Sequence, residues 1–136
     1  MAQATIHIAC LCAAWCRLCD DDRPTLQALA AEFTHADMHA HWHWVDIEDE
    51  AELVGELDVE TVPTLVIADD AQVRFAGPVT PQRETLQRLL RATVLEARPD
   101  TRWPAADAAV QALAAGLRRR TPDGFATAPS PNAQSE

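Results

Sequence analysis

Five residues, Trp15-Cys16-Arg17-Leu18-Cys19, constrain this chain more than any other stretch, because they place two cysteines three positions apart. The segment before them, Ile6 to Cys12, is short and apolar, which predicts a buried strand. Apolar residues then recur at helical spacing: Leu26, Leu29, Ala30 and Phe33. The cysteine pair is therefore expected at the junction between a strand and the N-terminus of a helix.

Cysteines at this spacing serve either metal binding or redox chemistry. Met1 to Thr5 carries no positive side chain, and no small-residue cleavage pattern follows the apolar run. We therefore expect no secretory signal and a cytoplasmic protein. Cysteines stay reduced in that compartment, so the pair is interpreted as catalytic or metal-binding rather than as a structural disulfide.

The net charge of −10 argues against nucleic acid as a partner, because no basic face offsets it. The cationic cluster Arg118-Arg119-Arg120 fits a helix C-terminus, where positive charge complements the helix dipole. No apolar stretch approaches the roughly 20 residues that a bilayer requires, so no membrane association is expected.

The remaining pattern predicts an alternation of strands and helices. Further strands are expected at His41 to Ile47, Thr64 to Ala68 and Gln72 to Ala76. Helices are expected from Leu18 to about Thr34, with Pro24 inside, and around Leu53 to Leu57. Another helix is expected to be capped by Thr80, with Pro81 at its first position. Its buried stripe would consist of Leu86, Leu89, Leu90 and Val94.

The resulting order is β-α-β-α-β-β-α, with the first two strands parallel because a helix connects them. We expect one α/β domain over residues 1–99, a helical extension over 100–120 and a disordered tail over 121–136. Pro104 is expected to open the helix of the extension, whose stripe of Val110, Leu113 and Leu117 would pack back on the core. The alternative is that the Trp103 segment and this helix cover an exposed sheet edge or a partner surface.

Four features together resemble the thioredoxin family over about Ile6 to Ala97. They are the motif closing the first strand, Pro24 five residues after Cys19, Thr61-Val62-Pro63-Thr64 opening the third strand, and Gly77 after the fourth. The resemblance implies a thioredoxin-like three-layer α/β/α sandwich with a four-stranded mixed sheet. The family's preceding β-α unit has no counterpart here, and a C-terminal helix is added.

A cysteine at a helix N-terminus faces unpaired backbone N–H groups, which favour the thiolate. We expect Cys16 to be the exposed nucleophile and Cys19, one helical turn further, to be the resolving thiol. The resemblance implies a cis Val62–Pro63 peptide, with Trp15, Val62 and Pro63 contacting substrate.

The function predicted is thiol–disulfide exchange with protein substrates, sustained by a thiol reductase or another electron donor, with no cofactor and no metal. The alternatives are a binding module with little turnover, or a zinc-binding protein.

The sequence departs from the family pattern around the cysteine pair. Arg17-Leu18 replaces the usual Gly-Pro; Arg17 favours the thiolate, while the acids at 20–22 oppose it. Cys10 stands where the family has a buried acid, and Trp44 aligns with the lysine that partners it. These replacements remove the cost of burying an ion pair and also the family's general base.

Two further groups of residues remain open in the sequence. Cys10 and Cys12 share one strand face. Inert packing is the first interpretation; thiol exchange between Cys12 and the motif pair, and a four-cysteine zinc site, are the alternatives. His39, His41 and His43 also share a face, opposite Trp42 and Trp44, and are expected to be solvated on an edge strand rather than to bind metal.

Overall fold

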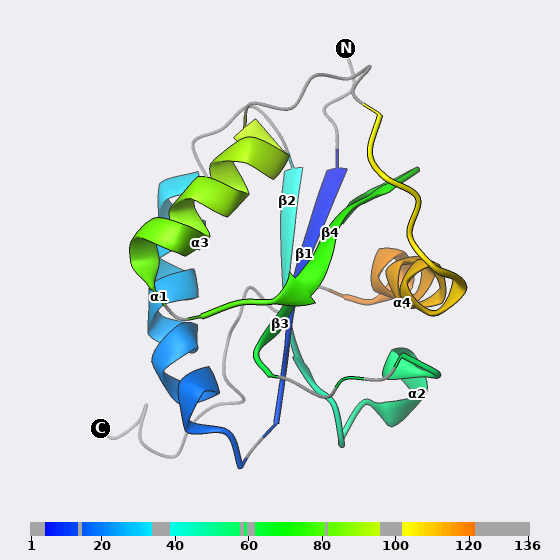
Figure 1. Cartoon of the computed structure of the whole chain (residues 1–136), viewed down its shortest axis with the longest axis horizontal. Helices are drawn as coiled ribbons and strands as arrows, with labels where there is room; N and C mark the ends of the chain where they lie inside the picture. The colour runs from blue at the N-terminus through cyan, green and yellow to red at the C-terminus, as the bar shows by residue number, and fades with distance from the viewer. Residues whose placement is uncertain are drawn as a thin grey trace.

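A four-stranded mixed sheet forms the centre of the protein (Figure 1). The computed structural model describes residues 5–13, 15–33, 39–57, 59, 62–80, 82–95 and 102–121. The strands are β1 (Thr5–Cys12), β2 (His39–Asp46), β3 (Thr64–Asp69) and β4 (Val73–Pro78). They lie in the order β2-β1-β3-β4, with β1 parallel to β2 and antiparallel to β3, and β4 antiparallel to β3. The predicted parallel pairing of the first two strands and the edge position of the second strand are confirmed.

Helices cover both faces of the sheet, which gives the three predicted layers (Figure 1). On one face lie α1 (Arg17–Phe33) and α3 (Arg83–Leu90), the latter continued by a π-helical turn over Arg91–Leu95. On the other face lie α2 (Ala51–Val54) and α4 (Ala108–Arg119). No helix in the described part of the chain is both long and apolar enough to cross a bilayer.

The alternation of β1 divides its side chains between two separate cores. Ile6, Ile8, Cys10 and Cys12 belong to the core beneath α1 and α3. Ala9 and Leu11 belong to the smaller core beneath α2 and α4. We call the first the thiol face of the sheet. The second, which also carries His7 and His43, is the histidine face.

The C-terminal helix packs back on the domain, as predicted. Leu113 and Leu117 are fully buried in the core of the histidine face, and burying a leucine side chain stabilises a fold by about 1.5–3 kcal/mol. Arg118 strengthens the contact, since its Nε donates to the Asp69 carbonyl at 2.9 Å. The predicted tail, residues 121–136, lies outside the described residues except for Thr121.

Two helix starts differ from the sequence prediction. Helix α3 begins at Arg83 after Gln82, not at a Thr80 cap, because Val79 still donates to the Pro63 carbonyl and continues the strand pairing. Pro81 lies outside the described residues. The last helix begins at Ala108 rather than Pro104. Asp107 is its N-cap, and the Asp107 carboxylate accepts the Val110 N–H at 3.0 Å.

Candidate active site

The cysteine motif lies between the end of β1 and the first turn of α1. The Cys16 N–H donates to the Ala13 carbonyl at 3.0 Å, which closes the turn between strand and helix. Because α1 begins at Arg17, Cys16 precedes the first turn and Cys19 lies within it. Helix N-termini hold backbone N–H groups without intrahelical partners, and Cys16 lies directly before such a terminus.

The two motif thiols contact one another and the peptide before β3. A hydrogen bond joins the Cys16 and Cys19 side chains. The Cys16 Sγ also donates to the Val62 carbonyl at 3.7 Å, and the Val62–Pro63 peptide is cis. All four cysteines of the chain are thiols in this structure. The helix start and the segment before β3, 46 residues apart in sequence, therefore meet at one sulfur.

The expected exposure of Cys16 is wrong. Cys16 is only 8% exposed and Cys19 2%, whereas Trp15 beside them is 66% exposed. The cause is the contact with Val62, since Cys16 and Val62 belong to the same buried cluster. The order of access is still the predicted one, with Cys16 less covered than Cys19.

Burial holds the pKa of the Cys19 thiol well above its ordinary value. Hydrogen bonding to Cys12 and to Cys16 raises the pKa further, and a backbone hydrogen bond from Ala13 opposes the shift. Cys19 is therefore a protonated, shielded thiol beside a less shielded partner.

The other two cysteines lie directly behind the motif pair. Cys10 and Cys12 are fully buried on the thiol face, which fits the packing interpretation. Their Sγ atoms are 3.4 Å apart, and Cys12 is hydrogen-bonded to Cys19. The parallel register pairs Cys10 with Trp44. The positions aligned with the family's acid and lysine are thus neighbours across two strands.

A cavity of about 270 Å³ adjoins this region. It is lined by Cys12, Ala13, Cys19, Asp20, Arg23, Trp44 and Asp46. The Arg23 guanidinium lies 4.1 Å from the centre of the Trp44 ring, within cation–π range. Neither Arg23 nor Asp46 was among the predicted site residues. The helical spacing of Arg23 from Cys19 was the available signal for Arg23.

The motif-tuning residues are resolved in part. The Arg17 side chain is exposed at the helix start, and the Asp20 side chain is exposed at the cavity. The side chains of Leu18, Asp21 and Asp22 lie outside the described residues. Among the residues described, no group of three or more His, Cys, Asp or Glu side chains is arranged to hold a metal ion.

The predicted solvated histidines on β2 are wrong for His43, which is fully buried, and His41 is half-buried. The side chain of His39 lies outside the described residues. The cause is Arg120, at the C-cap of α4, whose Nη1 lies 3.0 Å from the His43 Nδ1. Arg120 also makes two 2.8 Å hydrogen bonds to the Glu50 carboxylate. Trp42 and Trp44 pack on the thiol face, so their predicted position opposite His43 is confirmed.

Donor counting fixes the protonation of this histidine cluster. Arginine can only donate, so the His43 Nδ1 accepts and the ring proton is on Nε2. The His43 Nε2 then donates to the His7 Nδ1 at 3.3 Å. His7 Nε2 in turn faces Asp70 at 4.0 Å. Burial, followed by the Arg120 charge, lowers the pKa of His43 to about 3, so this ring is neutral.

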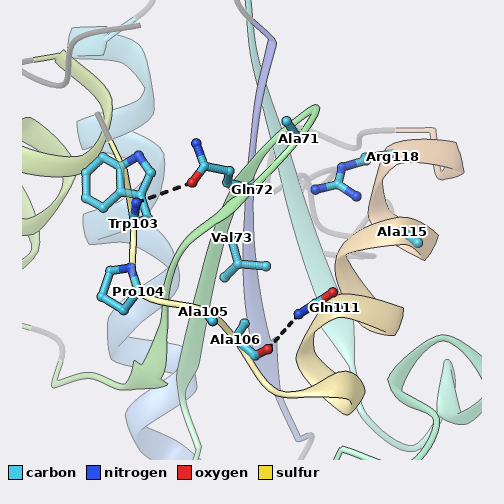
Figure 2. A pocket seen from close by; sticks show the side chains of 10 residues that line it. All are labelled: Ala71, Gln72, Val73, Trp103, Pro104, Ala105, Ala106, Gln111, Ala115 and Arg118. Atoms are coloured by element: carbon cyan, nitrogen blue, oxygen red, sulfur yellow. Dashed lines mark hydrogen bonds between the residues drawn. The ribbon is translucent and has the colours of Figure 1, made fainter. Parts of the chain in front are cut away.

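A second, larger cavity of about 390 Å³ lies beside α4, away from the cysteines (Figure 2). Trp103 and Gln72 border it on one side and Arg118 on the other. The backbone N–H of Trp103 donates to the Gln72 Oε1 at 3.3 Å, and the side-chain Nε2 of Gln111 donates to the Ala106 carbonyl. These contacts tie the segment before α4 to the edge of the sheet, and the cavity contains none of the thiols.

Comparison with known proteins identifies the family to which this fold and site belong. The thioredoxin family model matches residues 1–92, which include the motif, the cis peptide and all four strands. The chain belongs to the thioredoxin family. The described helix α4 lies beyond the matched residues, so the histidine face of this thioredoxin-family protein is covered by a segment outside the family match.

Solved structures support the fold. The thioredoxin of Trypanosoma brucei brucei is 22% identical with a TM-score of 0.57, over 71% of this chain and 80% of that one. Fasciola hepatica thioredoxin is 20% identical with a TM-score of 0.57, over 67% and 83%. The germline-specific thioredoxin Deadhead of Drosophila melanogaster is 19% identical with a TM-score of 0.57, over 66% and 82%. A search of curated proteins found no significant match.

Proposed function

We propose that this protein is a thiol–disulfide oxidoreductase that exchanges disulfides with protein substrates through Cys16 and Cys19. The observation that carries the proposal is the hydrogen-bonded Cys16–Cys19 pair at the start of α1, held against the Val62 carbonyl beside the cis Val62–Pro63 peptide. Membership of the thioredoxin family supports it. The helix N-terminus provides the electrostatics that a nucleophilic thiolate needs.

The reaction follows from the different environments of the two sulfurs. The Cys16 thiolate attacks a substrate disulfide and forms a mixed disulfide, releasing one substrate thiol. Cys19 then attacks the Cys16 sulfur, which closes the Cys16–Cys19 disulfide and releases the second substrate thiol. A thiol donor returns the pair to the reduced state. The extended backbone at Val62 and the exposed Trp15 ring provide the substrate contacts.

The resolving step needs a proton acceptor, because burial keeps Cys19 protonated. Cys10 occupies the position aligned with the family's acid and cannot act as a carboxylate. Asp46, whose side chain lines the cavity shared with Cys19, is the group we propose for this role. The Asp46 Oδ1 is held by the backbone N–H groups of Glu48 and Asp49, which orients the carboxylate.

Insulin reduction with dithiothreitol as the donor tests the proposal. Cys16→Ser should abolish the catalysed rate, whereas Cys19→Ser should accumulate a mixed disulfide that migrates more slowly on a non-reducing gel. Both variants should keep the wild-type thermal unfolding midpoint. Unchanged turnover by Cys16→Ser would refute the assignment.

The direction of electron flow can be determined by measuring the reduction potential of the same purified protein. We propose a cytoplasmic reductant supplied by a thiol reductase. Its reduction potential, measured in a glutathione buffer series, should then lie near the cytosolic poise of about −220 to −320 mV or below it. A much higher potential would identify an oxidant or isomerase instead.

A second candidate is a protein-binding module with little turnover. The 66% exposure of Trp15, beside a Cys16 that is 8% exposed, favours it because the aromatic ring is offered more openly than the sulfur. A Cys16→Ser/Cys19→Ser variant that binds reduced, alkylated casein as tightly as wild type, together with a wild type inactive on insulin, would select this function. Loss of binding in Trp15→Ala would locate the contact.

A further inference from the structure

The four thiols form one continuous series of contacts. Cys16 is hydrogen-bonded to Cys19, Cys19 to Cys12, and Cys12 lies 3.4 Å from Cys10, measured between the sulfurs. Cys16 directly precedes α1 and Cys19 lies in its first turn, whereas Cys10 and Cys12 belong to β1. The series therefore runs from the helix start into the strand beneath it. Cys19 therefore has two sulfur neighbours on different elements.

The position of Cys12 allows it to do more than pack in the core. Cys12 and Cys19 both line the 270 Å³ cavity, whereas Cys10 and Cys16 are not among its lining residues. The same cavity is also lined by Asp20, Arg23 and Asp46. The two sulfurs thus share a space with two aspartates, whose carboxylates can accept a proton.

We propose that Cys12 is a third redox thiol, which accepts the disulfide from the Cys16–Cys19 pair and leaves Cys16 reduced. The inference rests on the proposed function, because it starts from the Cys16–Cys19 disulfide that substrate reduction creates. Cys12 loses its proton into the cavity, and its thiolate attacks the Cys19 sulfur. The Cys12–Cys19 bond forms, the Cys16–Cys19 bond breaks, and Cys16 leaves as a thiolate.

This step is an exchange without net oxidation. One disulfide and one thiol are present before and after it, so no further oxidant or reductant is required. The consequence is a second oxidised state, in which the disulfide is buried behind α1 and Cys16 again stands at the helix start as a nucleophile. The protein would then hold one disulfide, two oxidising equivalents, internally while Cys16 can react with another substrate.

Two matched double variants test whether the bond can form. Cys10→Ala/Cys16→Ser keeps Cys12 and Cys19, which line the same cavity. Cys12→Ala/Cys16→Ser keeps Cys19 but removes the sulfur that shares this cavity with it. After equilibration with oxidised glutathione, the first should contain an intramolecular disulfide, measured as loss of both titratable thiols without bound glutathione. The second should form none.

Wild type provides a measurement that does not depend on those variants folding. The protein is oxidised to one disulfide per chain, alkylated and digested with trypsin, which separates Cys19 from the other cysteines at Arg17. Fragment spectra should show Cys12–Cys19 as well as Cys16–Cys19, with part of Cys16 alkylated. In Cys12→Ala, Cys16 should be fully protected. Exclusive Cys16–Cys19 pairing in wild type, or an unlinked first double variant, would overturn the proposal.

Failure of the relay and failure of the proposed function give different results. If only the relay is wrong, wild type reduces insulin but Cys16 is never alkylated in the oxidised protein. If the proposed function is wrong, wild type does not reduce insulin, whereas the glutathione-driven exchange between the internal sulfurs can still be scored.

Discussion

The two faces of the sheet bury polar chemistry in opposite ways. On the thiol face, sulfurs lie in an apolar core, where each thiol demands little hydrogen bonding and can exchange partners. On the histidine face, Glu50, Arg120, His43, His7 and Asp70 form a series of ionic and hydrogen-bonded contacts. Only one arrangement of the ring proton on His43 satisfies the donors and acceptors in this series, so the hydrogen bonding of each group depends on its neighbours.

Because of this difference, one face of the sheet carries the proposed chemistry and the other mainly stabilises the fold. The thiol face lies inside the family match and carries the groups proposed to react. The histidine face is completed by α4, from beyond the match, and its polar groups hold this helix against β2. Changes to the thiol face should therefore alter exchange more than folding, and changes to the histidine face should do the reverse.

The largest effect is expected from the nucleophile. Cys16→Ser should reduce the insulin-reduction rate to the uncatalysed background, because serine is not a nucleophile toward disulfides under these conditions. Its free energy of unfolding in urea should stay within about 1 kcal/mol of wild type, since the replacement is nearly isosteric. A large loss of stability together with retained turnover would remove the distinction between the faces.

The next effect is the response of the histidine face to pH. His43 in the folded protein has a pKa of about 3, below the ordinary 6.5, because of burial and then Arg120, His7 and His41. Between these values the unfolded chain binds a proton that the folded protein does not. Stability from this group is therefore complete above pH 6.5 and is lost as the pH falls toward 3, by up to about 1.4 kcal/mol per pH unit.

Urea unfolding from pH 7 to pH 4 measures this dependence. Asp70 and Glu50 also face the cluster, so the matched variant is needed to isolate the imidazole. In His43→Gln the slope should be shallower than in wild type. An identical slope in the two proteins would assign the acid sensitivity to His7, whose pKa is also lowered by burial, or to the carboxylates.

The fold was predictable because it depends on local signals. The apolar run to Cys12, the cysteines before a helical stripe, and Val62-Pro63-Thr64 at a strand start each indicate an element from their own residues. Alternation also placed Cys10 and Cys12 on the side opposite Ala9 and Leu11. The helix starts were less predictable, since Thr80 and Pro104 carry valid capping signals that strand pairing and the Asp107 cap override.

The buried histidines could not be predicted because their environment is built by distant residues. The alternation of side chains along β2 places His43 where an edge strand would expose it to solvent. Only the packing of α4 brings Arg120, 77 positions away in sequence, against the His43 ring. The site shows the same limit. Spacing paired Cys16 with Cys19, but the contact between Cys12 and Cys19 and the position of Arg23 over Trp44 depend on how β1, β2 and α1 pack.

Two arginines near the edge strand give the next comparison. Arg120 makes a bidentate pair with Glu50 and donates to the Trp44 carbonyl at 3.2 Å. Arg120→Met should lower the free energy of unfolding by about 2–3 kcal/mol, because it leaves the His43 Nδ1 and a half-buried carboxylate without their donor. Arg119→Met, at an exposed position of the same helix end, is the control and should change little.

The smallest effect is expected from the arginine on the thiol face. Arg23 stacks on the Trp44 ring, but its Nε is buried and makes no hydrogen bond to any described residue. The cation–π contact contributes roughly 0.5–1 kcal/mol, and the unsatisfied Nε offsets part of it. Arg23→Met keeps the apolar stem over the ring, so its cost in urea unfolding should stay below about 1 kcal/mol. If Arg23→Met destabilised the protein as much as Arg120→Met, the thiol face would also depend on a polar network, and the contrast between the two faces would fail.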